Sequence, residues 1–201
     1  MTVAASIVIA YPKASLELAQ EVINVSRRVG VQPEWLANLI NAESGFRASA
    51  VNKYSGASGL IQFMPDTARG HGTTVEAIRG MNAMQQMPYV EEYLQSKSRS
   101  HGGLQTQEKL FLAVFYPAAI KASTREYCDR YGVKAPCYDQ YQMSSSVRSQ
   151  NPGIHDAQDY INFVLRKAKM AHTSFALNYW WVGLIAASLL TGALMYRRRF
   201  R

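Results

Sequence analysis

Residues 33–45 read Pro-Glu-Trp-Leu-Ala-Asn-Leu-Ile-Asn-Ala-Glu-Ser-Gly, and this stretch carries the signals of an α-helix from its first residue to its last. Pro33 is favoured in the first turn of a helix, and Gly45 is favoured just after the last turn. The apolar side chains between them recur at helical spacing, at Trp35, Leu36, Leu39 and Ile40. The stretch therefore predicts a helix that buries one face.

The sequence on either side of this stretch is also helical in its periodicity. Before it, an apolar stripe ends at the stop signal Gly30 and consists of Leu16, Ala19, Val22, Ile23 and Val29. After it, Thr73 and Glu76 have capping-box spacing for a short helix around 74–79, and further helices are expected over 82–98, 107–122 and 156–171. Alternation of period two is almost absent, so we predict an all-α fold with loops near 56–59 and 131–136.

Length and composition bound the class of protein. The 201 residues are about one domain's worth of chain with room for an appendage, and 48% apolar residues exclude a disordered protein. The net charge is +8, but four of the positive charges are arginines among the last five residues, which leaves the body at +4. Such a mild excess fits an anionic partner, and no nucleic acid is expected as a partner.

Glu43 stands at the end of the predicted helix over 33–45, where the helix dipole is negative. The dipole disfavours the ionised carboxylate, so the pKa of Glu43 should be raised. Leu39 and Ile40 lie one turn before it and Phe46 follows it, so an apolar wall is expected to raise the pKa further. A general acid that works near neutral pH needs such a shift. Taken alone, the feature also fits an exposed glutamate at a helix end.

The residues around Glu43 form a longer pattern. It consists of Glu43-Ser-Gly-Phe46, then Ala50-Val-Asn52, then Ser55-Gly-Ala-Ser-Gly-Leu-Ile-Gln-Phe-Met-Pro65 and Thr67-Ala68. In order and spacing this pattern resembles the signature of the soluble-lytic-transglycosylase-like family. The segments Phe111–Ile120, Asn151–Ile154 and Asp159–Ile161 look like later helices of the family's bacteriophage form. The resemblance covers residues 30–168 and implies a lysozyme-like helical fold of the goose type.

The resemblance implies a site and a reaction. Glu43 would be the catalytic acid and then the base in cleaving the β-1,4 bond between N-acetylmuramic acid and N-acetylglucosamine of peptidoglycan. The residues that would line the saccharide cleft are Ser44, Ser58, Gly59, Gln62, Met64 and Tyr116. Without the resemblance, Met64 would be assigned to the core and Gln62 to the surface. Tyr116 precedes Pro117, where many family members have Asn, so its helix should end or kink there.

Most glycosidases need two carboxylates, whereas the reaction implied by the family needs one. The next acid in the chain, Asp66, follows Pro65 and is better explained as an N-cap or first-turn residue of a following helix. In a lytic transglycosylase the muramic C6 hydroxyl attacks internally and leaves a 1,6-anhydro end. The alternatives are a hydrolytic lysozyme and a non-catalytic, membrane-anchored protein that binds glycan or has a structural role.

The chain after residue 170 differs from the rest. From 170 to 196 there is no Asp, Glu, Lys or Arg, and the 18 residues 179–196 would span about 27 Å as a helix. The sequence predicts a lead-in over 1–30, a catalytic domain over 31–170, a transmembrane helix over 175–196 and a basic tail over 197–201. Ser188 and Gly192 have a small-xxx-small spacing through which two such helices can associate.

The two ends of the chain bear on how the domain would be exported. The apolar run Val3–Ala10 has no basic residue before it and so lacks the charged region of a signal peptide. Because the basic tail favours the cytoplasmic side, the domain would have to cross the membrane. We expect a protein of the virion membrane of a membrane-containing phage that penetrates the host wall. The alternative is the bacterial inner membrane, with the domain facing the periplasm.

The two cysteines, Cys128 and Cys137, fit either a disulfide in an oxidising compartment or two free thiols in the cytosol. No histidine has ligand spacing to either of them, so no metal is expected. No cofactor is expected, because the chain has no phosphate-binding glycine loop and no Cys/His nucleophile pattern.

Overall fold

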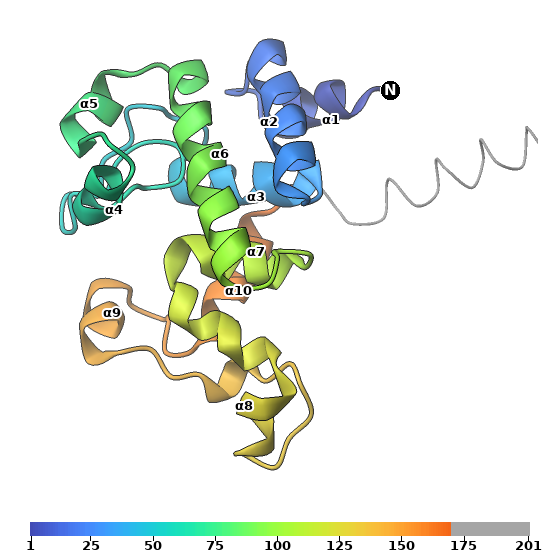
Figure 1. Ribbon diagram of the computed structural model, residues 1–201. Coiled ribbons are helices and arrows are strands. Elements are labelled where there is room, and N and C mark those ends of the chain that lie inside the picture. Colours follow the sequence, from blue (N-terminus) through green and yellow to red (C-terminus); the bar gives the residue numbers. More distant parts are fainter. Residues whose placement is uncertain (170–201) are drawn as a thin grey trace, which may run out of the picture. The chain divides into compact units, whose positions relative to one another are not determined.

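The computed structural model describes residues 1–169, and this part consists of helices joined by loops (Figure 1). The α-helices are α1 (Val3–Ala10), α2 (Leu16–Val29), α3 (Pro33–Ser44), α4 (Pro65–Gly70), α5 (Val75–Gly80), α6 (Ala83–Ser100), α7 (Gln107–Phe115), α8 (Arg125–Asp129), α9 (Ser145–Gln150) and α10 (Ala157–Lys167). Two 3₁₀-helices, η1 (Pro117–Ser123) and η2 (Tyr138–Gln140), lie between them. Over residues 1–169 the β-pairing is limited to isolated bridges, so the predicted all-α class is confirmed for this part.

The predicted membrane helix over 175–196 and the basic tail over 197–201 lie outside the described residues. Within residues 1–169 no helix is both long and apolar enough to cross a membrane. The apolar run Val3–Ala10 is helix α1, whose Ala4 and Ile7 are buried in the core. This run is therefore a packed part of the fold in the structure.

Helix ends follow the local sequence signals closely. Gly30 and Gly45 both have left-handed backbones, with φ of 81° and 59°, and end α2 and α3 as predicted. The predicted cap of the short helix was one residue off, because Thr74, not Thr73, accepts from the Ala77 N–H and α5 spans Val75–Gly80. The predicted apolar stripe of α2 was wrong at its first residue, since Leu16 is 63% exposed.

The helix predicted over 107–122 is broken in the structure. α7 ends at Phe115, Tyr116 has φ −151° and ψ 78°, and η1 begins at Pro117. A residue before proline is pushed out of the helical region by the proline ring, which explains the break. The last helix is also shorter than the predicted 156–171, because α10 ends at Lys167.

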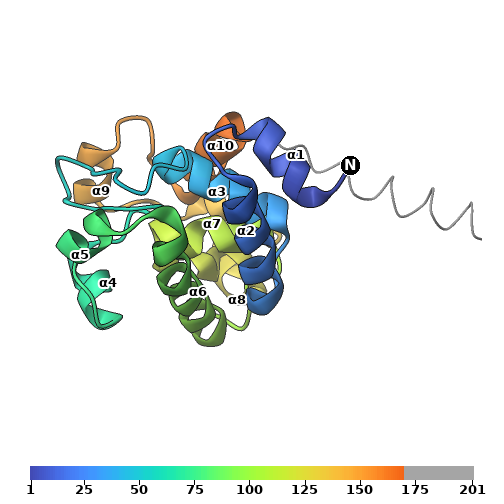
Figure 2. The ribbon, with the colours of Figure 1, turned by 90° about the horizontal axis from the view of Figure 1, so that it is seen from above.

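Helix α3 lies at the centre of the described part. It packs against α1, α2, α7 and α10, and Figure 2 shows it among these helices from a second direction. Leu36, Leu39 and Ile40 are completely buried, and even the polar Asn38 is 2% exposed. A helix enclosed on most of its faces is held rigidly, so the residues at its C-terminal end are fixed by the core.

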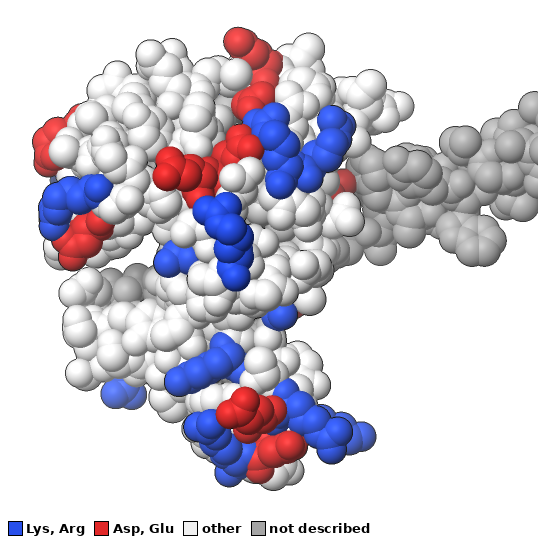
Figure 3. All heavy atoms as spheres, viewed as in Figure 1, with Lys and Arg blue, Asp and Glu red and all other residues white. Residues whose placement is uncertain are grey.

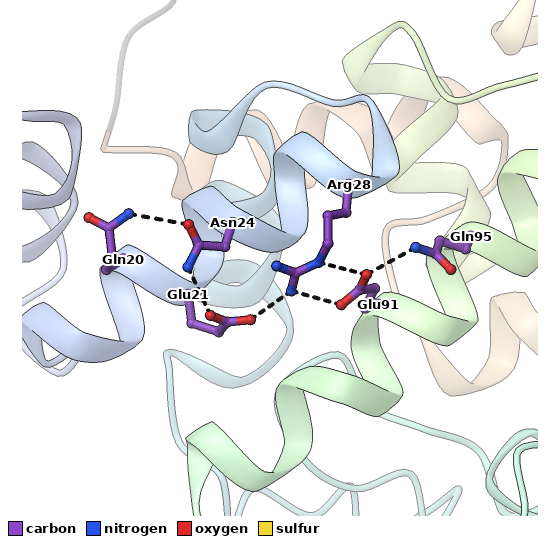
Figure 4. A network of polar contacts seen from close by, with 6 residues as sticks. All are labelled: Gln20, Glu21, Asn24, Arg28, Glu91 and Gln95. Carbon is purple, nitrogen blue, oxygen red and sulfur yellow. Dashed lines mark hydrogen bonds and ion pairs between the residues drawn. The ribbon is translucent and has the colours of Figure 1, made fainter.

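A polar network joins α2 to α6 on the outside of the core (Figure 4). The Arg28 guanidinium donates to both carboxylate oxygens of Glu91 at 2.7 and 2.8 Å and to Glu21 at 2.8 Å. Asn24 and Gln95 donate to the same two glutamates. A fork-shaped pair of this kind adds orientation as well as energy, so the network fixes the register between the two helices.

We call the segment 117–143, which contains η1, α8 and η2, the disulfide lobe. Cys128 and Cys137 are joined by a disulfide and are almost fully buried. The backbone N–H of Cys137 donates to the carbonyl of Ala122 at 2.9 Å, which ties the end of the lobe back to η1. Of the two alternatives that the sequence left open, the structure has the disulfide.

Candidate active site

Glu43 occupies the last turn of α3, two residues before the left-handed Gly45. Its side chain is partly buried, and burial of the carboxyl raises its pKa from the usual 4.5 to about 7. A hydrogen bond from Tyr160 and the positive charge of Lys167 act in the opposite direction and lower the pKa. The predicted rise in pKa is therefore present, and desolvation is its largest cause.

Tyr160, on α10, donates its hydroxyl to Oε1 of Glu43. The tyrosine is 1% exposed, and its ring is stacked on Phe115 with centroids 3.9 Å apart and planes 8° apart. Burial and the neighbouring Glu43 carboxyl raise the pKa of the phenol well above its usual value, so it remains a donor. The Tyr160 ring cannot turn away without disturbing the core, and it therefore fixes the orientation of Glu43.

This role of Tyr160 was not predicted from the sequence. The residue had been placed in the closing helix, but the contact joins residues 117 positions apart and leaves no local pattern. The signal that could have found it is a tyrosine on the apolar stripe of α10, where a buried hydroxyl requires a partner.

Lys167 connects the end of α10 to the end of α3. Its ammonium donates to the carbonyl of Ala42 at 3.3 Å, and the Asn41 amide donates to the Lys167 carbonyl at 3.0 Å. A cation at a helix C-terminus complements the dipole there. The same charge lowers the pKa of Glu43, so Lys167 partly offsets the effect of burial.

The loop between α3 and α4 carries four of the predicted site residues and is organised by a buried glutamine. The amide nitrogen of Gln86, on α6, donates to the carbonyls of Ala48, Ile78 and Met81, and its oxygen accepts from the Leu60 N–H at 2.8 Å. Gln86 is completely buried. Sequence analysis did not single it out, since its partners are backbone groups of distant segments.

Two of the predicted residues in this loop, Ser58 and Gly59, are in its interior. Ser58 is fully buried, and its hydroxyl donates to Gly56 O and accepts from Nε of Arg79. Gly59 has φ +84°, and a Cβ there would lie 2.6 Å from Oε1 of Gln86 and 2.7 Å from Ile78. Both residues therefore shape the loop, and sugar contact by either remains a prediction.

Gln62 and Met64 lie nearer the surface. Gln62 has a left-handed φ of 54°, and its amide donates to Gly59 O at 3.0 Å, so this loop brings Ser58, Gly59 and Gln62 together. Met64 is 47% exposed, so its assignment to the core from sequence pattern alone was wrong. Contact of either side chain with sugar, which the family resemblance implies, remains a prediction.

Ser44 and Tyr116, the other two predicted cleft residues, lie outside this loop. The hydroxyl of Ser44, which is 3% exposed, donates to the carbonyl of Ile40 within α3. Tyr116 is partly buried and its ring lies 6.0 Å from that of Tyr141. The hydroxyl that donates to Glu43 belongs to Tyr160. Contact of Ser44 or Tyr116 with sugar remains a prediction.

The surface of the described part is hollowed between the region of α4 and α5 and the region of α9, on the side drawn to the left in Figure 3. Asp66, in the first turn of α4, is exposed and forms an ion pair with Arg69, as expected for a first-turn acid. Its N-cap role is not observed, since Met64 is the N-cap residue. Within residues 1–169 no cluster of three or more metal-ligating side chains occurs.

Comparison with known families agrees with this geometry. Residues 21–89 match the family model of the Transglycosylase SLT domain, which covers about a third of the chain. Members of that family are lytic transglycosylases that degrade peptidoglycan. The match includes Glu43 and the loop around Gln86, but neither Tyr116 nor Tyr160. No curated protein and no solved structure matches the chain.

Proposed function

We propose that this protein is a peptidoglycan lytic transglycosylase that cleaves the MurNAc-β-1,4-GlcNAc bond and leaves a 1,6-anhydro end. One observation carries the proposal: the Glu43 carboxyl has a pKa of about 7 and is oriented by Tyr160, within the segment that matches the Transglycosylase SLT domain. A carboxyl with this pKa is protonated in a large fraction of molecules at neutral pH and can therefore act as a general acid.

In the first step, Glu43 gives its proton to the glycosidic oxygen and the C1–O4 bond breaks. Tyr160 donates to Oε1, so the proton is carried on Oε2, which is left for the substrate. The substrate's own acetamido group stabilises the positive charge that develops at C1. The carboxylate that remains is stabilised by the Tyr160 donor and by the charge of Lys167.

In the second step, the carboxylate of Glu43 takes the proton of the muramic C6 hydroxyl as that oxygen attacks C1. The proton returns to a group whose burial favours the neutral form, so one residue completes the cycle. No water enters the products. The exposed and ion-paired Asp66 is not required as a second carboxylate.

The test is to incubate the full chain in mild detergent with purified peptidoglycan and to weigh the released muropeptides by mass spectrometry. Products lighter than hydrolytic ones by one water are expected from the wild type and from the control Asp66→Asn. With Glu43→Gln the rate should fall by about 10²- to 10⁴-fold. Products with reducing ends would identify a hydrolytic lysozyme, and the absence of any Glu43-dependent product would favour a non-catalytic protein that binds glycan or has a structural role.

We also propose that residues 175–196 anchor the protein in a lipid membrane and that it acts in the virion of a membrane-containing phage during penetration of the host wall. The support is the uncharged stretch 170–196 and the spacing of Ser188 and Gly192, through which two anchors would associate. The protein should then co-purify with the lipid fraction of such virions. Its presence only in bacterial inner membranes would favour the alternative location, with the domain facing the periplasm.

A further inference from the structure

Four tyrosines of the region 116–141 form a continuous row of ring contacts, which we call the tyrosine row. The ring centroids are 6.0 Å apart between Tyr116 and Tyr141, 5.8 Å between Tyr141 and Tyr127, and 5.3 Å between Tyr127 and Tyr131. The outermost ring, Tyr131, is 48% exposed, whereas the other three are partly buried. The row therefore leads from the end of α7 to the surface.

The inner end of the tyrosine row is close in the chain to the groups that hold Glu43. Tyr116 directly follows Phe115, whose ring is stacked on Tyr160. Tyr160 in turn donates to the Glu43 carboxylate. One series of contacts thus joins Glu43, Tyr160 and Phe115. The tyrosine row begins at the next residue, Tyr116, and leads outward from there.

Polar groups accompany the rings. The hydroxyls of Tyr127 and Tyr131 lie 3.2 Å apart, and burial together with the neighbouring tyrosines raises the pKa of Tyr127 to about 12, so this phenol stays neutral. The ammonium of Lys121 lies 5.5 Å from the ring centre of Tyr127 and 5.3 Å from that of Tyr141. The row therefore offers ring surface, hydroxyls and one cation within a small area.

The surroundings make this arrangement rigid. Tyr127 precedes Cys128, whose disulfide to Cys137 closes the lobe. The charged side chains of α8 and of Arg130, which follows it, form ion pairs, Arg125 with Asp129 at 3.6 Å and Arg130 with Glu126 at 3.4 Å. Figure 3 shows blue and red side chains gathered together at this lower end of the molecule. Since the α8 charges are mixed in sign, they do not by themselves select a polyanion.

We propose that Tyr116, Tyr141, Tyr127 and Tyr131, with Lys121, bind the glycan strand beyond the sugars that are cleaved at Glu43. Sugar rings present apolar C–H faces that pack on aromatic rings and hydroxyls that bond to phenols. The carboxylates of the peptides on muramic acid are attracted by Lys121. This binding surface rests on the proposed function, and it selects long strands over short fragments.

The test compares long glycan strands with fragments just long enough to occupy the cleavage site, using the full chain. Tyr131→Ala should raise KM for long strands by about fivefold, with kcat and the kinetics on short fragments unchanged. Lys121→Ala should weaken cleavage of peptide-bearing strands more than of strands stripped of their peptides. The matched control is Val133→Ala, which shortens an exposed apolar side chain of the same lobe outside the row and should change nothing.

An equal loss on long and short substrates, or no loss on either, would overturn the proposal. Tyr131→Phe keeps the ring and should retain most of the affinity, which separates ring packing from general damage to the lobe. Sedimentation of the chain with insoluble peptidoglycan, with Glu43→Gln as the common background, measures binding without catalysis. If no variant cleaves peptidoglycan but Tyr131→Ala still weakens sedimentation, the enzymatic proposal fails and the binding surface stands.

Discussion

At the scale of single residues, burial of the Glu43 carboxyl makes the folded protein less stable as the pH rises. Its pKa is about 7 in the folded protein and about 4.5 when exposed, so the folded state binds more protons between these values. Stability therefore decreases from pH 4.5 to pH 7 and stays lower above it. Glu43→Gln removes this effect and should stabilise the protein by up to about 3 kcal/mol at pH 8.

The measurement is thermal unfolding of wild type and Glu43→Gln at pH 4 and pH 8. The variant should gain stability at pH 8 and little at pH 4. An exposed glutamate, Glu17, provides the control Glu17→Gln, for which the two pH values should give similar differences. The same gain for Glu43→Gln at both pH values would show that the carboxyl is not desolvated.

Tyr160 lowers the pKa of the same carboxyl, whereas burial raises it. Because its hydrogen bond lowers the pKa of Glu43, Tyr160→Phe should raise that pKa and move the alkaline limb of kcat/KM to higher pH. Loss of the donor that stabilises the Glu43 carboxylate should also slow the step in which Glu43 gives up its proton, by about tenfold. The control Tyr138→Phe removes another buried hydroxyl and should leave the limb in place; a limb that moves to lower pH would contradict the assignment.

Prediction from the sequence was strongest where a residue acts on its own neighbours. The end of α3 at Gly45 follows from position in one helix. The direction of the Glu43 pKa shift was also predicted, although its largest cause is burial in the folded protein. The Tyr160 contact does not follow from one helix, because it requires α10 to pack beside α3. Ser44 differs from Tyr160, because its hydroxyl donates to the carbonyl of Ile40 one turn earlier in the same helix.

At the scale of elements, the loop before α4 depends on a close approach of backbone to Gln86. Gly59→Ala would place a methyl group 2.6 Å from Oε1 of Gln86 and 2.7 Å from Ile78, at a left-handed φ. The variant should lose about 2–4 kcal/mol of unfolding free energy, from steric overlap added to backbone strain. The matched control is Gly30→Ala, which has a similar φ of +81° but nothing within 4 Å, and should lose only about 1 kcal/mol.

Urea unfolding of the two variants separates overlap from strain. Equal losses would mean that the Gln86 side chain gives way, and that the loop is less tightly held than its hydrogen bonds indicate.

The break of α7 at Pro117 could be predicted because proline acts on the residue before it. The arrangement of the loop around Gln86 could not, because its partners come from three separate segments.

At the scale of the whole molecule, the candidate site is completed by parts of the chain far from the segment that matches the family model. The family match ends at residue 89, whereas Tyr160 and Lys167 come from α10. Phe115, which is stacked on Tyr160, comes from α7. The second half of the described chain therefore positions the acid that the first half supplies, which is why a local signature identifies Glu43 but not the residues that set its pKa.

The disulfide lobe gives a prediction at the same scale. Cys128 and Cys137 are nine positions apart, and closing such a loop should stabilise the folded chain by about 2–3 kcal/mol. A reducing agent should therefore lower the Tm of the wild type, whereas the double variant Cys128→Ala/Cys137→Ala should unfold at a lower temperature with no response to reductant. Because Glu43 and Tyr160 lie outside the lobe, the alkaline limb of kcat/KM should stay in place while affinity for long strands falls. A shift of that limb on reduction would mean that the lobe also positions the acid.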